Sequence, residues 1–371
     1  MSEENITINN QLIIETSPQI KSTQTTAKIM WTVVIALLPA GVWGVFVFGF
    51  KSLIVLLVTI AASVVTEYML NLVFKRKTLF DGSAVLTGLL IGFNMPPSVP
   101  LFIPVIASVF AIAIVKWSFG GLGGNWMNPA LAGRVFVFFS WTSGMNSWKT
   151  PSALSTMPDA LSTATPLGLF KTGMIDYTGG TVSTSDFLQN TGYTVSAFAE
   201  SVSGFFQQSL GIVLKPLNID LFVGNSSGCI GEVSALLLLL GAALLLYKKI
   251  ITWHIPVAYL GSFALLTWIF GGIPYEFGYF SGEIWFNLFS GGLILGAFYM
   301  ATDMVTSPIT GKGMIYFGIG VGFLTFLLRF FGSLPEGVSL AIILMNIFVP
   351  LIDRYIKPKV FGKANKKGVV K

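Results

Sequence analysis

Long apolar runs separated by short polar segments constrain the fold of this chain more than any other feature. Hydrophobic residues make up 53% of the 371 residues and charged residues only 10%, against about 25% charged residues in an ordinary soluble domain. The runs are about 20 residues long, which is the length of a helix that crosses a bilayer. Because a soluble core could not bury so many Phe and Leu side chains, the sequence predicts an all-α polytopic membrane protein.

The hydropathy pattern predicts ten membrane-spanning helices in two halves of five. The predicted spans are 30–50, 53–74, 81–97, 101–118, 127–142, 229–247, 253–271, 284–302, 314–331 and 337–353. The first half is expected at 29–142 and the second at 229–353, on either side of a polar loop at 143–228. A cytoplasmic N-terminal segment, 1–28, and a basic cytoplasmic tail, 354–371, complete the predicted organisation.

Basic residues predict which side of the membrane each segment occupies. They cluster at Lys75–Lys77, at Lys248 and Lys249, and in the tail, and each cluster borders an apolar span, as the positive-inside rule expects for cytoplasmic ends. Both termini are therefore expected in the cytoplasm and the 143–228 loop outside. The net charge of +6 has this origin, and since no basic stripe with interleaved aromatics is present, nucleic-acid binding is not expected. The polar first 28 residues and the long first apolar run argue against a cleavable signal peptide.

Five spans in each half predict that two homologous halves would be inverted in the membrane, an arrangement common in transporter folds. The segment Phe80–Leu86, FDGSAVL, is similar to Phe289–Leu295, FSGGLIL. A few matches in so apolar a sequence do not decide between two alternatives, an inverted repeat and two unrelated halves.

The third and eighth spans are interrupted, at Asn94–Pro97 and at Thr302–Pro308. Proline removes a backbone donor and disfavours helix in the preceding residue. Broken backbone inside a membrane is tolerated where protein buries it or where it lines a wet cavity. Paired breaks therefore predict a central ligand or ion site, and Thr302 and Asp303 are the candidates for an ion pathway, with an interfacial helix cap as the alternative. Other charged residues inside spans are also candidates for function or for pairing: Glu67, Arg134 and Glu232.

Metal chemistry within this chain is not expected. Cys229 is the only cysteine, and one thiolate cannot hold an iron–sulfur cluster or close an internal disulfide. The only histidine, His254, is interpreted as an interfacial packing residue.

The polar loop contains the sequence Asp159-Ala-Leu-Ser162-Thr-Ala164-Thr165. It is similar to D-x-x-S-x-A-T, the acceptor signature of flavin transferases, in which the last threonine receives flavin mononucleotide (FMN) through a phosphoester bond. Thr165 lies between Ala164 and Pro166, so its hydroxyl is sterically open and the proline holds the residue before it extended. The alternative interpretation is a helix cap or turn, because Ser, Thr and Asp favour both.

Further motifs lie in the order Leu86–Leu90, Asn94–Pro97, Gly120–Ala130, Gly228–Glu232 and Ala301–Asp303. Together with the loop motif, over about residues 25–355, they resemble the D subunits of Rnf complexes, bacterial ferredoxin:NAD+ oxidoreductases that couple electron transfer to ion pumping. The related B subunits of sodium-translocating NADH:quinone reductases are similar in design. Those subunits typically have a longer N-terminus and a Gly where this chain has Thr163, which favours the Rnf family.

The resemblance implies a membrane-embedded electron carrier in the bacterial cytoplasmic membrane. Thr165 would carry covalent FMN, and a flavin transferase would read Asp159, Ser162 and Ala164. Electrons would pass between ferredoxin and NAD, coupled to Na+ or H+ translocation, only in assembly with partner subunits that carry iron–sulfur clusters and flavins. A second, noncovalent flavin, riboflavin, is implied near Asn125 and Asn128, with helix packing through satisfied amides as the alternative.

An inverted-repeat solute transporter or channel, in which the loop motif is incidental, is the alternative function. Fold alone does not separate it from an electron carrier, because one fold serves many functions. A flavin that stays on the denatured chain would decide between the two.

Overall fold

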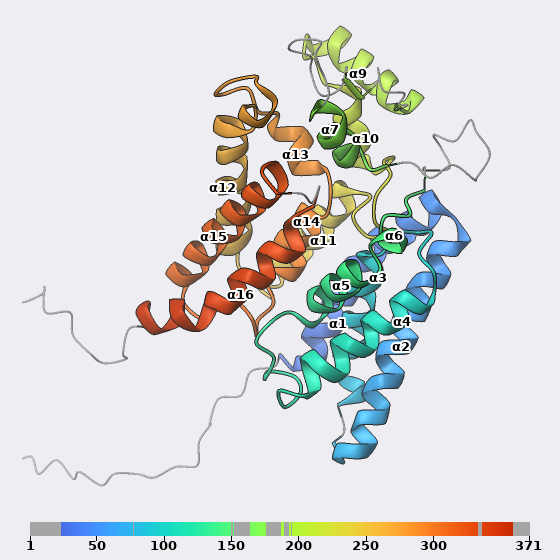
Figure 1. The fold of residues 1–371 in the computed structure, drawn as a ribbon, viewed down its shortest axis with the longest axis vertical. Helices are drawn as coiled ribbons and strands as arrows, with labels where there is room; N and C mark the ends of the chain where they lie inside the picture. The colour runs from blue at the N-terminus through green and yellow to red at the C-terminus, as the bar shows by residue number, and fades with distance from the viewer. Residues whose placement is uncertain are drawn as a thin grey trace, which may run out of the picture.

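The computed structural model describes residues 24–76, 78–149, 151, 164–175, 187–188, 193, 195–332 and 336–358. The elements in these ranges are helices (Figure 1), which confirms the all-α prediction. Five helical segments are long and apolar enough to cross a membrane: α1 (Thr26–Phe48), α2 (Phe50–Phe74), α12 (His254–Phe270) with the turn that extends it to Tyr275, α15 (Gly311–Phe330) and α16 (Val338–Tyr355). Shorter apolar helical segments are α3 (Ser83–Phe93), α4 with η2 (Phe102–Val109 and Phe110–Trp117), α5 (Pro129–Ser140) and α11 (Ala235–Tyr247).

Helices from the two halves of the sequence pack against each other in the middle of the molecule. The pairs are α1 with α11 and α5 with α16. Within each half, α2 packs on α3 and α4, and α12 packs on α15. Large apolar side chains remain exposed on the outer helices, as expected of surfaces that face lipid; examples are Phe46, Leu72, Val257 and Phe323.

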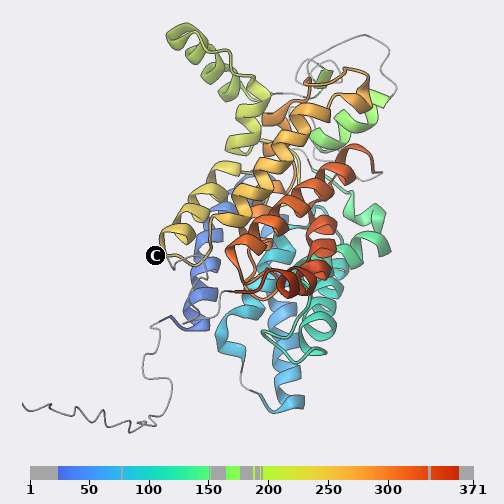
Figure 2. The same ribbon diagram turned by 90° about the vertical axis from the view of Figure 1, so that its left-hand side faces the viewer.

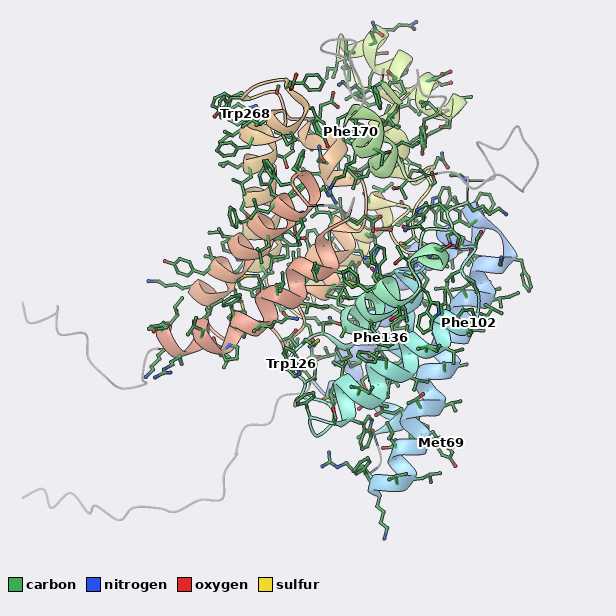
Figure 3. All side chains as sticks on the ribbon, in the orientation of Figure 1. Met69, Phe102, Trp126, Phe136, Phe170 and Trp268 are labelled. Carbon is green, nitrogen blue, oxygen red and sulfur yellow. The ribbon has the colours of Figure 1, made fainter. Side chains whose placement is uncertain are left out.

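The short helices of the polar loop gather at one end of the molecule. They are α7 (Pro166–Ile175), α9 (Ala197–Leu210) and α10 (Pro216–Val223), with α9 projecting away from the bundle (Figure 2). In Figure 3, Phe170 of α7 and Trp268 of α12 lie at this end, while Met69 of α2 and Trp126 lie toward the other. The start of α1 and the end of α16 also lie away from α7 (Figure 1).

Two predicted spans are broken helices. The third is helical only over α3 and ends at Asn94. The eighth consists of α13 (Ile284–Phe289), a non-helical turn at residues 290–292, α14 (Leu293–Leu295) and the π-helical η5 (Gly296–Met300), and residues 301–310 are non-helical. The interruptions predicted at Asn94–Pro97 and Thr302–Pro308 are thus confirmed, and a further break lies at 290–292.

The prediction of a helix over 229–247 is wrong for its first six residues, because α11 begins only at Ala235. The preceding segment lies against the end of α3 instead. Ile230 N donates to Met95 O (3.1 Å) and Gly231 N donates to Phe93 O (2.9 Å). The last carbonyls of a helix have no partner within the helix, and this segment supplies donors for them.

Asparagine side chains join the broken segments across the bundle. Asn128 caps α5 by accepting from Ala130 N (3.0 Å), while its amide nitrogen donates to Met300 O (3.3 Å) at the end of η5. Asn94 Nδ2 donates to Leu90 O (2.7 Å). The side-chain amide of Asn346, on α16, makes two such contacts. Its nitrogen donates to Thr306 O (3.1 Å), and its oxygen accepts from the backbone N–H of Asn128 (3.2 Å).

We expect Gly231→Ala to destabilise the protein. A Cβ atom at this position would overlap the Phe93 side chain, so the methyl group would push the segment off the end of α3, and such overpacking costs about 1–3 kcal/mol. Thermal unfolding of the purified protein in detergent measures the change. Gly261→Ala is the matched control, since nothing lies within 4 Å of its Cβ position, and equal unfolding temperatures for the two variants would contradict the proposed packing.

Candidate cofactor and ion site

Thr165 lies directly before α7. Its Oγ1 accepts from Gly168 N (3.1 Å), and its carbonyl accepts from Leu169 N (2.9 Å). This is the pattern of a threonine N-cap, and Pro166 at the next position suits the first turn of a helix. The cap that we gave as the alternative interpretation of the motif is therefore present. A helix N-terminus also favours a bound phosphate, so the cap and an attached FMN phosphate are compatible.

The other motif residues are placed only in part. Asp159 and Ser162 lie outside the described residues. Ala164 is described, and its carbonyl accepts from Ser227 Oγ (3.3 Å). That contact holds the end of the motif against the segment that precedes α11.

α7 is anchored on the second half of the chain. Its Leu167 and Phe170 are buried in a small apolar cluster with Phe286 of α13. Lys171 Nζ donates to Arg329 O (2.7 Å) and Gly332 O (2.6 Å) at the end of α15, where a cation interacts favourably with the helix dipole. Burial, together with the nearby Arg329 guanidinium, lowers the pKa of Lys171 from 10.5 to about 8. This anchoring leaves Thr165 only 5% exposed.

Thr165 lines a small cavity between the polar loop and the second half of the chain. The cavity volume is about 10 Å³, and its walls come from four segments: Thr165 to Leu167, Leu221 to Val233, Phe289 to Gly291, and Glu336. The candidate Glu232 is part of this wall, and its Oε1 accepts from Cys229 N (2.9 Å). The flavin motif and an intramembrane carboxylate, which are 67 residues apart in the sequence, therefore share one site.

Arg134 supplies a buried positive charge beside this cavity. Its guanidinium pairs with Glu336 Oε2 (2.6 Å), donates to Ser339 Oγ (2.6 Å) and contacts Cys229 Sγ (3.7 Å). Of the alternatives left open for Arg134, the structure shows pairing with an acidic residue, and the sequence did not point to Glu336 as that partner. The ligand atoms of Cys229, Glu232 and Glu336 lie within 4.8 Å of one another.

A second buried arginine was missed in the sequence analysis. Arg329, in the last turn of α15, donates to Asn287 O (2.6 Å) and Ser290 O (3.2 Å), and its guanidinium lies 5.1 Å from the centre of the Phe263 ring. The signal available in the sequence is a lone arginine late in an apolar span. Charged side chains rarely occur there without a partner or a function.

Glu67 is paired with a residue that the sequence analysis also missed. Lys116 Nζ lies 2.9 Å from Glu67 Oε2 and donates to Ser83 Oγ (2.7 Å), while Trp117 Nε1 donates to the same carboxylate oxygen (3.0 Å). Both charges are fully buried. This ion pair joins the late part of α2, the end of η2 and the start of α3, so Glu67 has a structural role.

The four remaining candidates line one cavity on the Trp126 side of the bundle. Asn125, Asn128, Thr302 and Asp303 lie in its wall together with Lys116, and its volume is about 110 Å³. Asn125 Nδ2 donates to Met127 O (3.1 Å), Thr302 Oγ1 donates to Phe298 O (2.6 Å), and Asp303 Oδ2 accepts from Thr306 Oγ1 (3.1 Å). Pockets for larger organic ligands measure about 300–1,000 Å³, so a riboflavin would need this cavity to widen.

Comparison with known proteins identifies the family. The family model described as NQR2, RnfD, RnfE matches residues 13–362. This chain belongs to that family. It is 44% identical over 354 residues to the D subunit of the proton-translocating ferredoxin:NAD+ oxidoreductase complex of Clostridium ljungdahlii, covering 95% of this chain and 97% of the relative. It is 40% identical over 365 residues to the D subunit of the Na+-translocating ferredoxin:NAD+ oxidoreductase complex of Acetobacterium woodii, covering 98% and 97%.

A more distant relative shows that the likeness is not confined to those two proteins. The D subunit of the ion-translocating oxidoreductase complex of Stutzerimonas stutzeri is 36% identical over 363 residues, covering 92% of this chain and 93% of the relative. The region matched by the family model includes both cavities and the whole polar loop. The resemblance drawn from the motifs is therefore confirmed across nearly the full length, and with the apolar helices it identifies a multi-pass membrane protein.

We expect Thr165 to become accessible when α7 is released. In a Cys229→Ala background, Thr165→Cys should react slowly with a maleimide, because the position is buried under the anchored helix. Adding Lys171→Met removes two hydrogen bonds from a charged donor, each worth about 1.5–3 kcal/mol, and should raise the labelling rate about tenfold or more. The labelling rate is measured by quenching the reaction at set times and following the gel shift of the labelled protein. Thr172→Ala, on the same helix, is the control. An unchanged labelling rate in the Lys171→Met protein would show that other contacts hold α7.

Proposed function

We propose that this chain is the D subunit of an ion-translocating ferredoxin:NAD+ oxidoreductase complex in a bacterial cytoplasmic membrane. One combined observation carries the proposal. The chain is similar over nearly its full length to subunits of that name, and it also contains the motif D-x-x-S-x-A-T. In this role it passes electrons between ferredoxin and NAD through a bound flavin, coupled to the movement of Na+ or H+. It acts only in assembly with subunits that carry iron–sulfur clusters and further flavins.

The proposed cofactor is FMN joined through its phosphate to Thr165 Oγ1, with Asp159, Ser162 and Ala164 read by a flavin transferase. The start of α7 suits the phosphate, because its first backbone N–H groups and its dipole favour an anion. When bound, the flavin supplies the redox chemistry, accepting and donating electrons one or two at a time. The side chains of this chain would fix the threonine and exclude water from the ester.

The space around Thr165 determines how the flavin would be accommodated. A cavity of about 10 Å³ has room for one water-sized particle and none for an isoalloxazine ring. The ring therefore does not share the enclosed space with the ester in the described arrangement. Because Thr165 is buried, the transferase also needs α7 to leave its place, and we propose that attachment precedes the docking of this helix.

The proposed topology has ten crossings in two inverted repeats. Two buried cations support it, because they occupy corresponding places in the two halves. Lys116 ends η2 and contacts Ser83 at the start of the broken helix α3, and Arg329 ends α15 and contacts Ser290 just before α14. Such repeats place sites at broken helices near the middle of the membrane. Asp303 and Thr302 remain the proposed ion pathway, and Asn125 and Asn128 the proposed contacts of riboflavin.

The proposed orientation places both termini in the cytoplasm and the flavin-bearing loop outside. Basic residues lie just after α2, just after α11 and at the start of α15: Lys75, Lys248, Lys249 and Lys312. Positive charge of this kind marks the cytoplasmic side. Covalent attachment suits a carrier on the outer face, where a dissociable flavin would be lost. The likeness to redox subunits disfavours the alternative of a solute channel.

We expect a flavin to remain on the denatured chain. Purified from cells that express the flavin transferase, the protein should give a band on a denaturing gel that fluoresces under ultraviolet light. Thr165→Ala should abolish this fluorescence, because the phosphoester has no other hydroxyl at that position, and so should removal of the transferase. Thr172→Ala, a threonine change on the same helix, should keep it. A fluorescent band from the Thr165→Ala protein would place the attachment elsewhere, and an unmodified mass for the wild-type peptide would reject covalent flavin.

A further inference from the structure

Two buried oxygen atoms beside Thr165 have no hydrogen-bond partner among the described residues. They are Oε2 of Glu232 and Oγ of Ser290. Glu232 is 8% exposed and Ser290 is 1% exposed, so water at the protein surface does not satisfy them. Buried polar atoms nearly always have a partner in a native protein, and a pair without one points to a ligand.

Both residues line the enclosed cavity under Thr165. Its volume of about 10 Å³ fits one particle of the size of water. Oxygen-bearing side chains make up much of the wall: Thr165, Ser226, Ser227, Glu232, Ser290 and Glu336. Carboxylate and hydroxyl oxygens are the ligands that small, hard cations prefer, and this size and lining suit an ion such as Na+.

Gly292 lies against the free oxygen of Glu232. A Cβ atom at position 292 would lie 2.7 Å from Glu232 Oε2, which is closer than such atoms normally approach. The backbone there has a φ of −74°, which any residue adopts, so conformational freedom does not explain the glycine. The absence of a side chain at Gly292 matters here because it leaves Oε2 of Glu232 uncovered.

The charges around the cavity decide what it can bind. Among the described residues, four charged side chains line it or hydrogen-bond to its walls: Glu232, Glu336, Arg134 and Arg329. With the Cys229 thiol protonated and therefore neutral, the two positive charges of the arginines balance the two negative charges of the glutamates. Glu336 is already paired with Arg134, whereas Arg329 is bound to backbone carbonyls. The carboxylate of Glu232 is therefore the one of the two that is open to a further cation.

A phosphodiester on Thr165 would upset this balance. It adds one negative charge to the wall of a buried cavity, and a buried charge without compensation is strongly unfavourable. A cation on Glu232 restores neutrality in the cavity beside the phosphate. This step of the inference rests on the proposed function, while the two unpartnered oxygens and the cavity do not.

We propose that this cavity binds one monovalent cation of the size of Na+, with Glu232 Oε2 and Ser290 Oγ as ligands, and that the cation compensates the phosphate on Thr165. The charged and ionisable groups near Glu232 are Arg134, Arg329, Glu336 and Cys229. The site lies on the side of α7, distinct from the cavity that contains Asp303.

The test uses the purified full-length flavoprotein in detergent and measures its unfolding temperature in NaCl and in choline chloride at equal ionic strength. A ligand that binds the folded state raises this temperature by an amount set by its concentration relative to its dissociation constant. We expect a rise in the unfolding temperature that is specific to Na+. In the Glu232→Gln and Gly292→Ala proteins, a given increase in unfolding temperature should require a Na+ concentration about tenfold or more higher than in the wild type. This is the usual loss of affinity when the surroundings of a metal site are changed.

Two variants separate a lost ligand from a damaged fold. Ser290→Ala removes only a hydroxyl that has no partner among the described residues, and it should weaken the Na+ response without lowering the unfolding temperature in choline. Glu276→Gln, outside the cavity, is the control and should leave the response at the wild-type level. If Glu232→Gln does not fold, Gly292→Ala and Ser290→Ala still report on the site.

The outcomes distinguish this inference from the proposed function. No Na+-specific rise in the wild-type protein, or an unchanged Na+ response in Gly292→Ala and Ser290→Ala, overturns the cation site and leaves water as the occupant. Flavin fluorescence is scored on the same samples. A Na+ response that depends on Glu232 in protein without covalent flavin supports the cation site while rejecting the flavin. Equal Na+ affinity in Thr165→Ala and flavinylated protein overturns the charge compensation.

Discussion

Where α3 and η5 end inside the bundle, their terminal carbonyls lack helical partners, and lipid offers no replacement. The rest of the structure depends on how these groups are satisfied, because each unpaired group in a membrane costs several kcal/mol. The segment before α11 donates to the carbonyls of Phe93 and Met95. Asn128, which itself caps α5, donates to Met300 O. The same contacts that complete the broken helices therefore also hold the two halves together, and they leave cavities beside the breaks.

Buried charge follows the same rule of local compensation. The pair Glu67–Lys116 lies within the first half, and Arg134–Glu336 connects α5 to the residues just before α16. Replacing such a pair with apolar residues is often neutral, whereas removing one partner costs about 3–5 kcal/mol. These pairs are therefore better understood as fixing which segments meet than as sources of net stability. Arg134 places its charge where the polar loop returns to the bundle, and the site around Thr165 depends on that placement.

α7 connects the loop motif to this charged region. The threonine that the motif marks as a flavin acceptor is a helix cap, and Lys171 and Phe170 attach the helix to the second half. A motif read by another enzyme must be reachable, yet here its last residue is buried. In the proposed order of events α7 docks after modification, which would satisfy both requirements and exclude water from the ester. The family likeness supports the redox role, and the anchoring of α7 places the proposed acceptor beside the second half of the chain.

The sequence by itself determined the class of the protein, most of its helical spans, the breaks at Asn94 and Asp303 and the loop motif around Thr165, because these depend on local composition and short-range patterns. It did not predict that residues 229–234 leave the helix, because their hydropathy suits a span and only the end of α3 supplies the competing hydrogen bonds. The partner of Arg134 also needed the tertiary structure. Glu336 is 202 residues away, and no local signal selects one carboxylate among several at that separation. Likewise, only the anchoring of α7 on α13 and on the end of α15 brought Thr165 beside Glu232 and Ser290, since contacts between distant segments depend on the assembled bundle.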